Sequence, residues 1–189
     1  MKSGLTEVLI QRAIMVGRWQ KHFMLPNYNV MYWYEADVLE ISRSGYFVEW
    51  EIKLSPGDFR RDQLKEDKYS GKGTKHSRLL AHDPQGPSRF YYVAPEGMIK
   101  PEDLPPWAGL WEATLGTNPG RPTAHIGETV PAPRLHKVKL DPKVREHALG
   151  VCYWRLHHKM SGRYDMFPPV LDEGRAPDVT PEGSQISSV

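Results

Sequence analysis

One short stretch of the sequence places charged side chains where they could catalyse hydrolysis. The run from Tyr46 to Leu54 reads YFVEWEIKL, which is typical of a β-strand and carries Glu49, Glu51 and Lys53 at every second position. Alternate side chains of a strand point to opposite faces of a sheet, so these charges share one face and the apolar residues between them share the other. Charges at the centre of a sheet are tolerated when they are paired or hold a metal ion. The stretch therefore predicts a metal site or an ion-paired face.

A further acid, Asp37, lies on the preceding predicted strand and completes a set suited to phosphodiester hydrolysis. Mg²⁺ prefers oxygen ligands and keeps several waters, so one or two carboxylates are enough to bind it. Such an ion can activate water and stabilise charge on a phosphate. We therefore expect Asp37, Glu51 and the backbone carbonyl of Ile52 to bind Mg²⁺, with Mn²⁺ as a substitute. Lys53 is expected to assist the attacking water or to contact a phosphate oxygen.

Other interpretations of these acids stay open. The pattern acid-x-lysine occurs by chance in many strands, where it forms an exposed face with an ion pair across strands. Asp37, the apolar opposite face and the helix expected after Lys53 favour the metal site. Glu35 projects in the same direction as Asp37, so one of the two is the ligand. Glu7 is a further candidate ligand or a solvated residue, and Glu49 lies in the site or beyond it, paired with a lysine or arginine.

Helices and strands alternate around this stretch. Apolar residues at helical spacing predict the first helix, Ser44 and Gly45 favour a hairpin turn, and Ser55 before Pro56 is typical of a helix start. The expected elements are a helix at 4–23, strands at 30–41 and 46–54, a helix from 55 to 69, a loop at 72–88, strands at 89–94 and 108–113, a loop at 116–133 and a helix at 141–158. A hairpin followed by a crossover helix predicts a mixed sheet in an α/β fold.

Several of these runs together resemble the PD-(D/E)XK nuclease superfamily. The runs are Glu35–Leu39, Val48–Ser55, Asp58–Asp62 and Arg89–Gly97, and the likeness covers roughly residues 30–113. Within the superfamily, the chain is most similar to MmcB-type DNA-repair proteins and related uncharacterised phage proteins. The resemblance implies a restriction-endonuclease-like core, with a mixed central sheet flanked by helices, and metal-dependent cleavage of DNA.

The resemblance also implies roles for individual residues. By position, Asp37 matches the first acid of the family's motif, Glu51 the second and Lys53 the lysine, so these three are the candidate catalytic residues. The same match favours Asp37 over Glu35 as the ligand. The chain departs from the family pattern at Ala36, where a proline often precedes the first acid.

Basic residues are concentrated after the motif. Between residues 60 and 82, seven lysines and arginines face three acids: the basic residues are Arg60, Arg61, Lys65, Lys68, Lys72, Lys75 and Arg78. Such a row could contact the phosphate backbone of DNA, or it could be a solvated helix face and loop. Asp62 and Lys65 are helical neighbours that form a surface pair or contact the substrate.

Composition limits the class of protein. A single cysteine, Cys152, excludes an intrachain disulfide and, with the absence of a signal peptide, predicts a cytoplasmic protein. No stretch has the roughly 20 apolar residues that span a bilayer, so no membrane partner is expected. Cys152 lies near His157 and His158, but without a second cysteine a structural zinc site is not expected. We predict one domain at 1–165, with a core at 4–113, and a disordered tail at 166–189.

A second hypothesis comes from a different functional class. The same fold could serve as a catalytically inactive module that binds nucleic acid or protein. The complete set of Asp37, Glu51 and Lys53 favours the enzyme, because a decayed site would have lost a member. A structural phage protein or a host-interaction protein is a third, weaker possibility, based on the 72–88 loop and the acidic tail.

Overall fold

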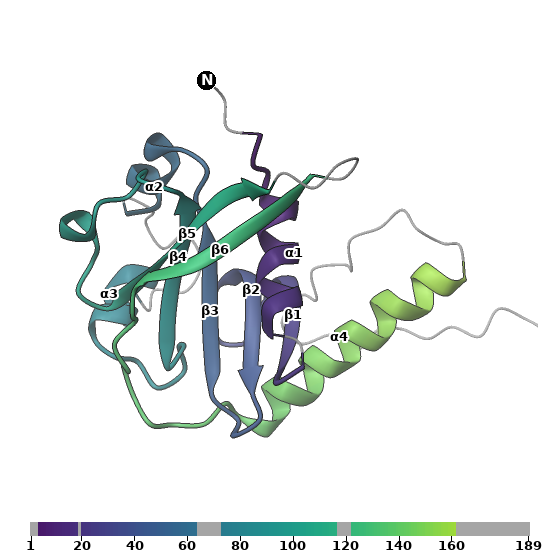
Figure 1. Ribbon diagram of the computed structural model, residues 1–189. Coiled ribbons are helices and arrows are strands. Elements are labelled where there is room, and N and C mark those ends of the chain that lie inside the picture. Colours follow the sequence, from purple (N-terminus) through teal and green to yellow (C-terminus); the bar gives the residue numbers. More distant parts are fainter. Residues whose placement is uncertain (1–3, 19, 64–72, 117–121, 162–189) are drawn as a thin grey trace, which may run out of the picture.

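The central element of the fold is a six-stranded sheet in the order β1-β2-β3-β4-β5-β6 (Figure 1). The structure is a computed structural model that describes residues 4–18, 20–63, 73–116 and 122–161. Its elements are α1 (Glu7–Arg18), β1 (His22–Asn29), β2 (Glu35–Ser42), β3 (Phe47–Ile52), α2 (Pro56–Gln63), α3 (Lys75–Leu80), β4 (Arg89–Pro95), the 3-10 helix η1 (Pro101–Asp103), β5 (Ala108–Gly116), β6 (Thr123–Val130) and α4 (Pro142–Met160).

The sheet is mixed, as predicted. β1, β2 and β3 are antiparallel to one another, β3, β4 and β5 are parallel, and β6 returns antiparallel to β5. The expected hairpin turn between β2 and β3 forms, and Gly45 takes a φ of 86°, which glycine adopts without steric cost. The chain then crosses over through α2 and α3 before β4 joins β3. The α/β class and the mixed sheet flanked by helices are confirmed, and they are consistent with a restriction-endonuclease-like core.

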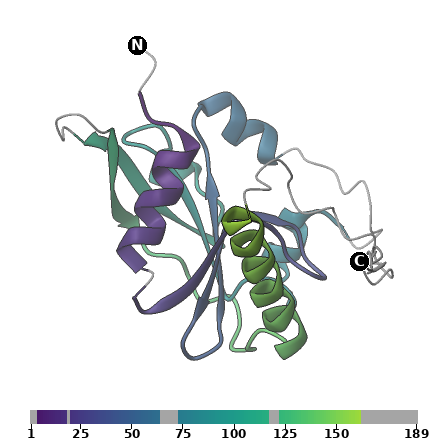
Figure 2. The same ribbon diagram turned by 90° about the vertical axis from the view of Figure 1, so that its right-hand side faces the viewer.

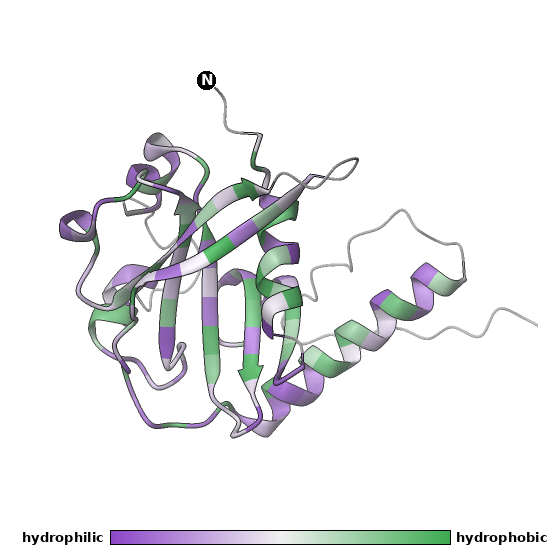
Figure 3. Ribbon diagram, viewed as in Figure 1, coloured by the Kyte–Doolittle hydropathy of each residue, from purple (hydrophilic) through white to green (hydrophobic). Residues whose placement is uncertain are grey.

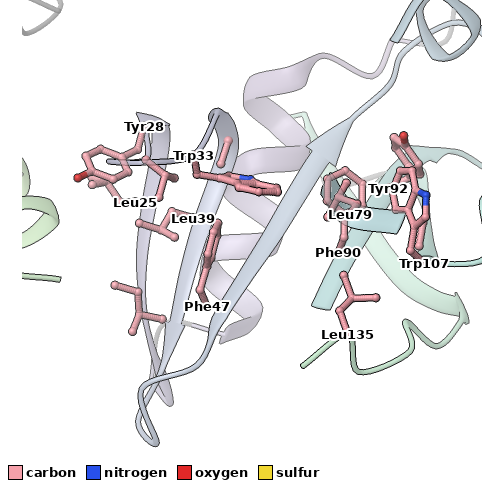
Figure 4. Packing of buried hydrophobic residues seen from close by; sticks show 14 of the residues in the cluster. Leu25, Tyr28, Trp33, Leu39, Phe47, Leu79, Phe90, Tyr92, Trp107 and Leu135 are labelled. Atoms are coloured by element: carbon pink, nitrogen blue, oxygen red, sulfur yellow. The ribbon is translucent and has the colours of Figure 1, made fainter. Parts of the chain in front are cut away.

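Helices cover both faces of the sheet (Figure 2). On one face, Ile10 and Ile14 of α1 pack against Val38, Trp50 and their apolar neighbours. On the other face, α2, α3 and α4 lie over an aromatic core. Figure 4 shows part of this core, whose labelled members include Trp33, Phe47, Phe90, Tyr92, Trp107 and Leu79. Because both faces are covered, all six residues of β3 are buried, including its glutamates.

Figure 3 colours the ribbon by the hydropathy of each residue, and β3 contains hydrophobic and hydrophilic residues although all six are buried. The sequence of β3, FVEWEI, places Val48, Trp50 and Ile52 on one face, as predicted, and α1 covers that face. Glu49 and Glu51 point to the opposite face. The burial of charge on that face is therefore a property of the sheet interior, and the charges must be neutralised there.

The largest error of the sequence prediction lies before β2. The first helix ends at Arg18 instead of continuing to 23, and β1 follows it as an additional strand. Pro26 concealed this strand, because proline is tolerated in a sheet mainly at an edge, and β1 is an edge strand. The predicted strand at 30–41 begins only at Glu35, after a turn in which Tyr32 has a φ of 67°.

Two segments predicted as loops contain regular elements. Within the 72–88 loop, Thr74 caps α3 by accepting a hydrogen bond from the Ser77 N–H. Within the 116–133 loop, β6 pairs with a β5 that runs to Gly116. In contrast, α4 matches its predicted range to within two residues, with Asp141 as its N-cap.

Some predictions fall on residues that the structure does not describe. The predicted end of the helix after Pro56, together with Lys65, Lys68 and Lys72, lies within 64–72. The tail predicted at 166–189 also lies outside the described residues. Within the described ranges, no helix is both long and apolar enough to cross a membrane.

Candidate active site

The predicted motif lies at one end of the sheet, where β2 begins and β3 ends (Figure 1). Val38 pairs with Trp50, so the neighbouring Asp37 stands beside the end of β3. The Asp37 carboxylate accepts a hydrogen bond from the Ile52 N–H at 2.6 Å. Asp37, Glu51 and Lys53 thus reach the same region, because each follows from the strand register and the two-residue alternation of side chains.

Glu51 is bound by two lysines. Lys53 Nζ lies 2.7 Å from Oε1, and Lys75 Nζ lies 2.8 Å from Oε2. Burial alone would raise the pKa of Glu51, but Lys75 and then Lys53 lower it below the usual value. Glu51 is therefore an ionised carboxylate whose two oxygens both contact ammonium groups.

Lys53 lies between two carboxylates from different elements. Besides Glu51, it contacts Oδ1 of Asp62, at 3.0 Å, and its side chain is only 3% exposed. Burial opposes the charge, but Glu51 and Asp62 outweigh it and raise the pKa of Lys53. The ammonium group therefore keeps its proton, so Lys53 is suited to act as a fixed positive charge and hydrogen-bond donor.

Asp62 is a buried member of this site that the sequence did not identify as such. Its side chain is 2% exposed. His76 Nε2 lies 3.1 Å from Oδ2, and the Tyr92 hydroxyl donates to the same oxygen at 3.3 Å. Burial and then Asp62 raise the pKa of Tyr92. The alternative of a surface pair with Lys65 does not fit a side chain that is buried against Lys53, while contact with substrate stays a prediction.

Glu49 and Lys75 form the second half of the arrangement. Glu49 accepts a hydrogen bond from Trp33 Nε1 at 2.7 Å and contacts Lys75 Nζ. Burial raises the pKa of Glu49 to about 7, although Lys75 opposes the shift. The Lys75 ammonium also donates to the carbonyl of Glu35, at 3.3 Å. Glu49 is thus paired with a lysine, which was one of its two predicted alternatives.

We refer to the following residues together as the buried charge cluster: Asp37, Glu49, Glu51, Lys53, Asp62 and Lys75. Its members come from β2, β3, α2 and α3 and from the residue directly after β3. Asp37 is the carboxylate at its border. Burial, and next the charge of Glu51, raise the pKa of Asp37 to about 7, while the Ile52 N–H opposes the shift.

The remaining candidate ligands lie at the edge of this cluster. Glu7 is exposed on α1 and accepts a hydrogen bond from Gln11 Nε2 at 3.1 Å. Gln11 also donates to the backbone carbonyl of Asp37, at 3.2 Å, so it links α1 to the site. The side chain of Glu35 is exposed, and only its carbonyl contacts Lys75. This geometry favours Asp37 over Glu35 as the carboxylate that belongs with Glu51.

The predicted phosphate-contacting row requires a correction. Lys75 is buried in the charge cluster, and the side chain of Arg78 is only 8% exposed. Arg78 binds Asp83 at 2.7 Å and stacks on Trp33, with 4.5 Å from Cζ to the ring centre. Both charges are neutralised inside the fold. Arg60 and Arg61 do lie at the surface of α2, and the other three members are outside the described residues.

Some residues in or near the site were not predicted from the sequence, and only some of them are marked by a local sequence pattern. Tyr92 pairs with Glu51 across the parallel strands, and a tyrosine in an apolar strand needs a partner for its hydroxyl. Thr74 marks the start of the helix that carries Lys75 and His76. No local pattern, however, indicates that Lys75 reaches Glu49 and Glu51, because they lie 26 and 24 positions earlier in the chain.

The donor chemistry of the cluster fits a hard divalent cation. Among the described residues, the cluster has four carboxyl groups and two ammonium groups, so carboxyl oxygens outnumber the lysines that contact them. Asp37 and Glu51, with the carbonyl of Ile52, offer only oxygen, which Mg²⁺ and Mn²⁺ prefer. Within the described part of the chain, no three His, Cys, Asp or Glu side chains are grouped as a complete metal site. Magnesium needs fewer protein ligands than that.

Cys152 has no role in this arrangement. It is a free, half-buried cysteine of α4 that packs against the aromatic core.

Comparison with known proteins identifies the fold only. No family model matches the chain, and no curated protein matches it. Among solved structures, the chain is similar to the SPO1766 protein of unknown function from Silicibacter pomeroyi, with a TM-score of 0.59 and 17% identity. The similarity covers 87% of this chain and 98% of that one. At this identity, the likeness supports a shared fold and carries no statement about activity.

Proposed function

We propose that this protein is a Mg²⁺- or Mn²⁺-dependent nuclease that hydrolyses phosphodiester bonds in DNA. The observation that supports the proposal is the convergence of Asp37, Glu51 and Lys53 at one end of the sheet, with Ile52 between them. Asp37 and Glu51 would hold the ion together with the Ile52 carbonyl. When bound, the ion would lower the pKa of a water molecule and stabilise negative charge on the phosphate.

Lys53 supplies a positive charge that does not depend on the ion. Glu51 and Asp62 hold its ammonium group from two sides, and its raised pKa keeps it protonated at neutral pH. A protonated lysine cannot accept a proton from water. Lys53 would therefore orient the water or donate a hydrogen bond to a phosphate oxygen, which stabilises charge as it develops.

DNA as the substrate rests on the family resemblance and on the surface of α2. Arg60 and Arg61 lie on the exposed side of the helix that follows Lys53. Phosphate contacts of this kind weaken as salt rises, because bound counterions are released from DNA. We place the activity in the cytoplasm, where the free Cys152 is compatible with a reducing environment.

Cleavage of supercoiled plasmid and single-stranded DNA in Mg²⁺ tests the proposal. We expect Asp37→Ala and Lys53→Ala each to lose activity by about a hundredfold or more, because each removes charge that acts on the reacting phosphate. Asp58→Asn is the matched control, since it neutralises an exposed carboxylate on the neighbouring helix α2. Unchanged activity in both site variants would remove the assignment.

A catalytically inactive binding module on the same fold is the second candidate. Both oxygens of Glu51 contact lysines, which favours a role for the cluster in stability alone. This candidate predicts that the wild-type protein binds DNA, measured by fluorescence anisotropy, without cleaving it in Mg²⁺ or Mn²⁺. It also predicts that free Mn²⁺, measured by electron paramagnetic resonance, does not fall when the protein is added.

A further inference from the structure

We infer that Lys75 is an internal cation that occupies Oε2 of Glu51 and must be displaced from it before a divalent ion binds. The inference rests on the proposed metal-dependent function and adds a residue that the motif does not contain. Lys75 Nζ lies 2.8 Å from Oε2 of Glu51, while Lys53 holds Oε1. With both oxygens contacted, an ion can gain a Glu51 oxygen only if one lysine leaves.

Lys53 is the lysine that stays. It lies directly after β3, its side chain is 3% exposed, and Glu51 and Asp62 hold it from two sides. Its removal from Glu51 would leave a buried ammonium group with a weaker set of partners, which is costly. Lys53 therefore behaves as a fixed part of the sheet.

Lys75 differs from Lys53 in its position and in its exposure to solvent. It is the first residue of the short helix α3, its side chain is 14% exposed, and it follows Gly73, whose φ is 93°. If it leaves Glu51, its ammonium group keeps two partners, the Glu49 carboxylate and the Glu35 carbonyl. Glu49 is thus a partner that Lys75 would retain, and this gives a reason for a buried glutamate that does not itself belong to the motif.

The exchange has a physical cause in the charge of the cluster. Without an ion, Glu49 and Glu51 would repel each other at the same face of β3, and the Lys75 ammonium, which contacts both, reduces this repulsion. A divalent ion at Glu51 carries twice that charge and makes Lys75 unnecessary there. Lys75 therefore stabilises the metal-free protein and weakens its affinity for the ion.

Metal binding without DNA tests the inference, with free Mn²⁺ measured by electron paramagnetic resonance. We expect Lys75→Met to bind Mn²⁺ at least about tenfold more tightly than the wild type, because the competing charge is gone. Lys53→Met is the matched control, since it also removes one ammonium group from Glu51. If Lys75 alone competes with the ion, Lys75→Met must bind Mn²⁺ several-fold more tightly than Lys53→Met.

The outcomes separate this inference from the proposed function. If the wild type binds Mn²⁺ and Lys75→Met binds it no more tightly than Lys53→Met, the competition is overturned and the metal site stands. If neither the wild type nor Lys75→Met binds Mn²⁺, both proposals fail. Should Lys75→Met lose its fold in EDTA, circular dichroism must show refolding in Mn²⁺. A variant that stays unfolded in both buffers would assign Lys75 to the core and overturn the inference.

Discussion

Asp37 is a carboxyl group whose environment favours its neutral form. Burial and the nearby charge of Glu51 raise its pKa from 3.8 to about 7. Between these values the unfolded chain has released this proton and the folded protein still holds it. Because the folded state then binds more protons, its free energy of unfolding falls as pH rises, at up to about 1.4 kcal/mol per pH unit for one group. An ion at Asp37 would take the place of that proton.

The first prediction concerns this pH dependence. In EDTA, we expect the melting temperature of the wild type to fall from pH 5 to pH 8. The melting temperature of Asp37→Asn should fall less over this range, since the amide keeps an acceptor for the Ile52 N–H without the charge. Thermal melts at several pH values measure both. At pH 8, Asp37→Asn should be the more stable protein in EDTA. An equal slope in the two proteins would contradict the pKa assignment.

Glu40 shows a second buried charge at the residue scale, on the face of α1. Arg18 contacts both of its oxygens, at 2.7 and 2.8 Å, and Trp50 Nε1 donates to it at 2.8 Å. His22 Nδ1 lies 2.9 Å away. Glu40 is fully buried, and the charged group that contacts both of its oxygens is Arg18, at the end of α1.

The second prediction follows from that pair. Arg18→Met should lower the free energy of unfolding by about 2–4 kcal/mol, because a buried glutamate loses its main partner. Urea denaturation measures the change. Arg12→Met, on the same helix, is the control. Because Arg12 is exposed, this substitution should change the free energy of unfolding little. A loss of similar size in both variants would mean that Glu40 does not depend on Arg18.

At the scale of elements, the site depends on how β4 and β5 pack beside β3. Gly109 of β5 is buried between Tyr91 and the chain that leaves β6. A Cβ at this position would lie 2.5 Å from the backbone nitrogen of Ala132 and 2.6 Å from the Tyr91 ring. Since the nearest atom belongs to the backbone, the sheet has little freedom to relax around a larger residue.

The third prediction tests this close approach. Gly109→Ala should destabilise the protein by about 1–3 kcal/mol through overpacking. Gly127→Ala is the matched control in the neighbouring strand β6, where a Cβ would meet no atom within 4 Å. Chemical denaturation distinguishes them. Equal stability of the two variants would contradict the close packing of β5 against the segment after β6.

Some helices and strands that begin or end at a local sequence signal were predicted correctly. The β2–β3 hairpin, the capped start of α2 and the helix α4 depend on local signals, such as Gly45, Ser55 and Asp141. β1 was missed because Pro26 argues against a strand unless its edge position is known. β6 was missed because the prolines and glycines of residues 116–133 are typical of a loop.

At the scale of the whole molecule, binding of a divalent ion would couple the strands and helices that form the charge cluster. The fourth prediction is that Mg²⁺ or Mn²⁺ at about 100 times its Kd stabilises the protein by about 2.7 kcal/mol, or roughly 5–11 °C in melting temperature. Scanning fluorimetry with and without EDTA measures the shift. It should vanish in Glu51→Gln and persist in Asp58→Asn. A shift that is equal in both variants would place the ion elsewhere.

The sequence alone determined the strand that carries Glu51 and leads into Lys53, the side of the sheet that both face, and the mixed α/β class, because side-chain alternation and helix caps are local properties of the chain. The tertiary structure decided which charges meet there. Asp62, Lys75 and Tyr92 reach the motif from other elements. Arg78 is buried because it pairs with Asp83 and stacks on Trp33. A buried charge takes its partner from whatever the fold brings within a few ångströms, and that proximity is not a property of any single segment.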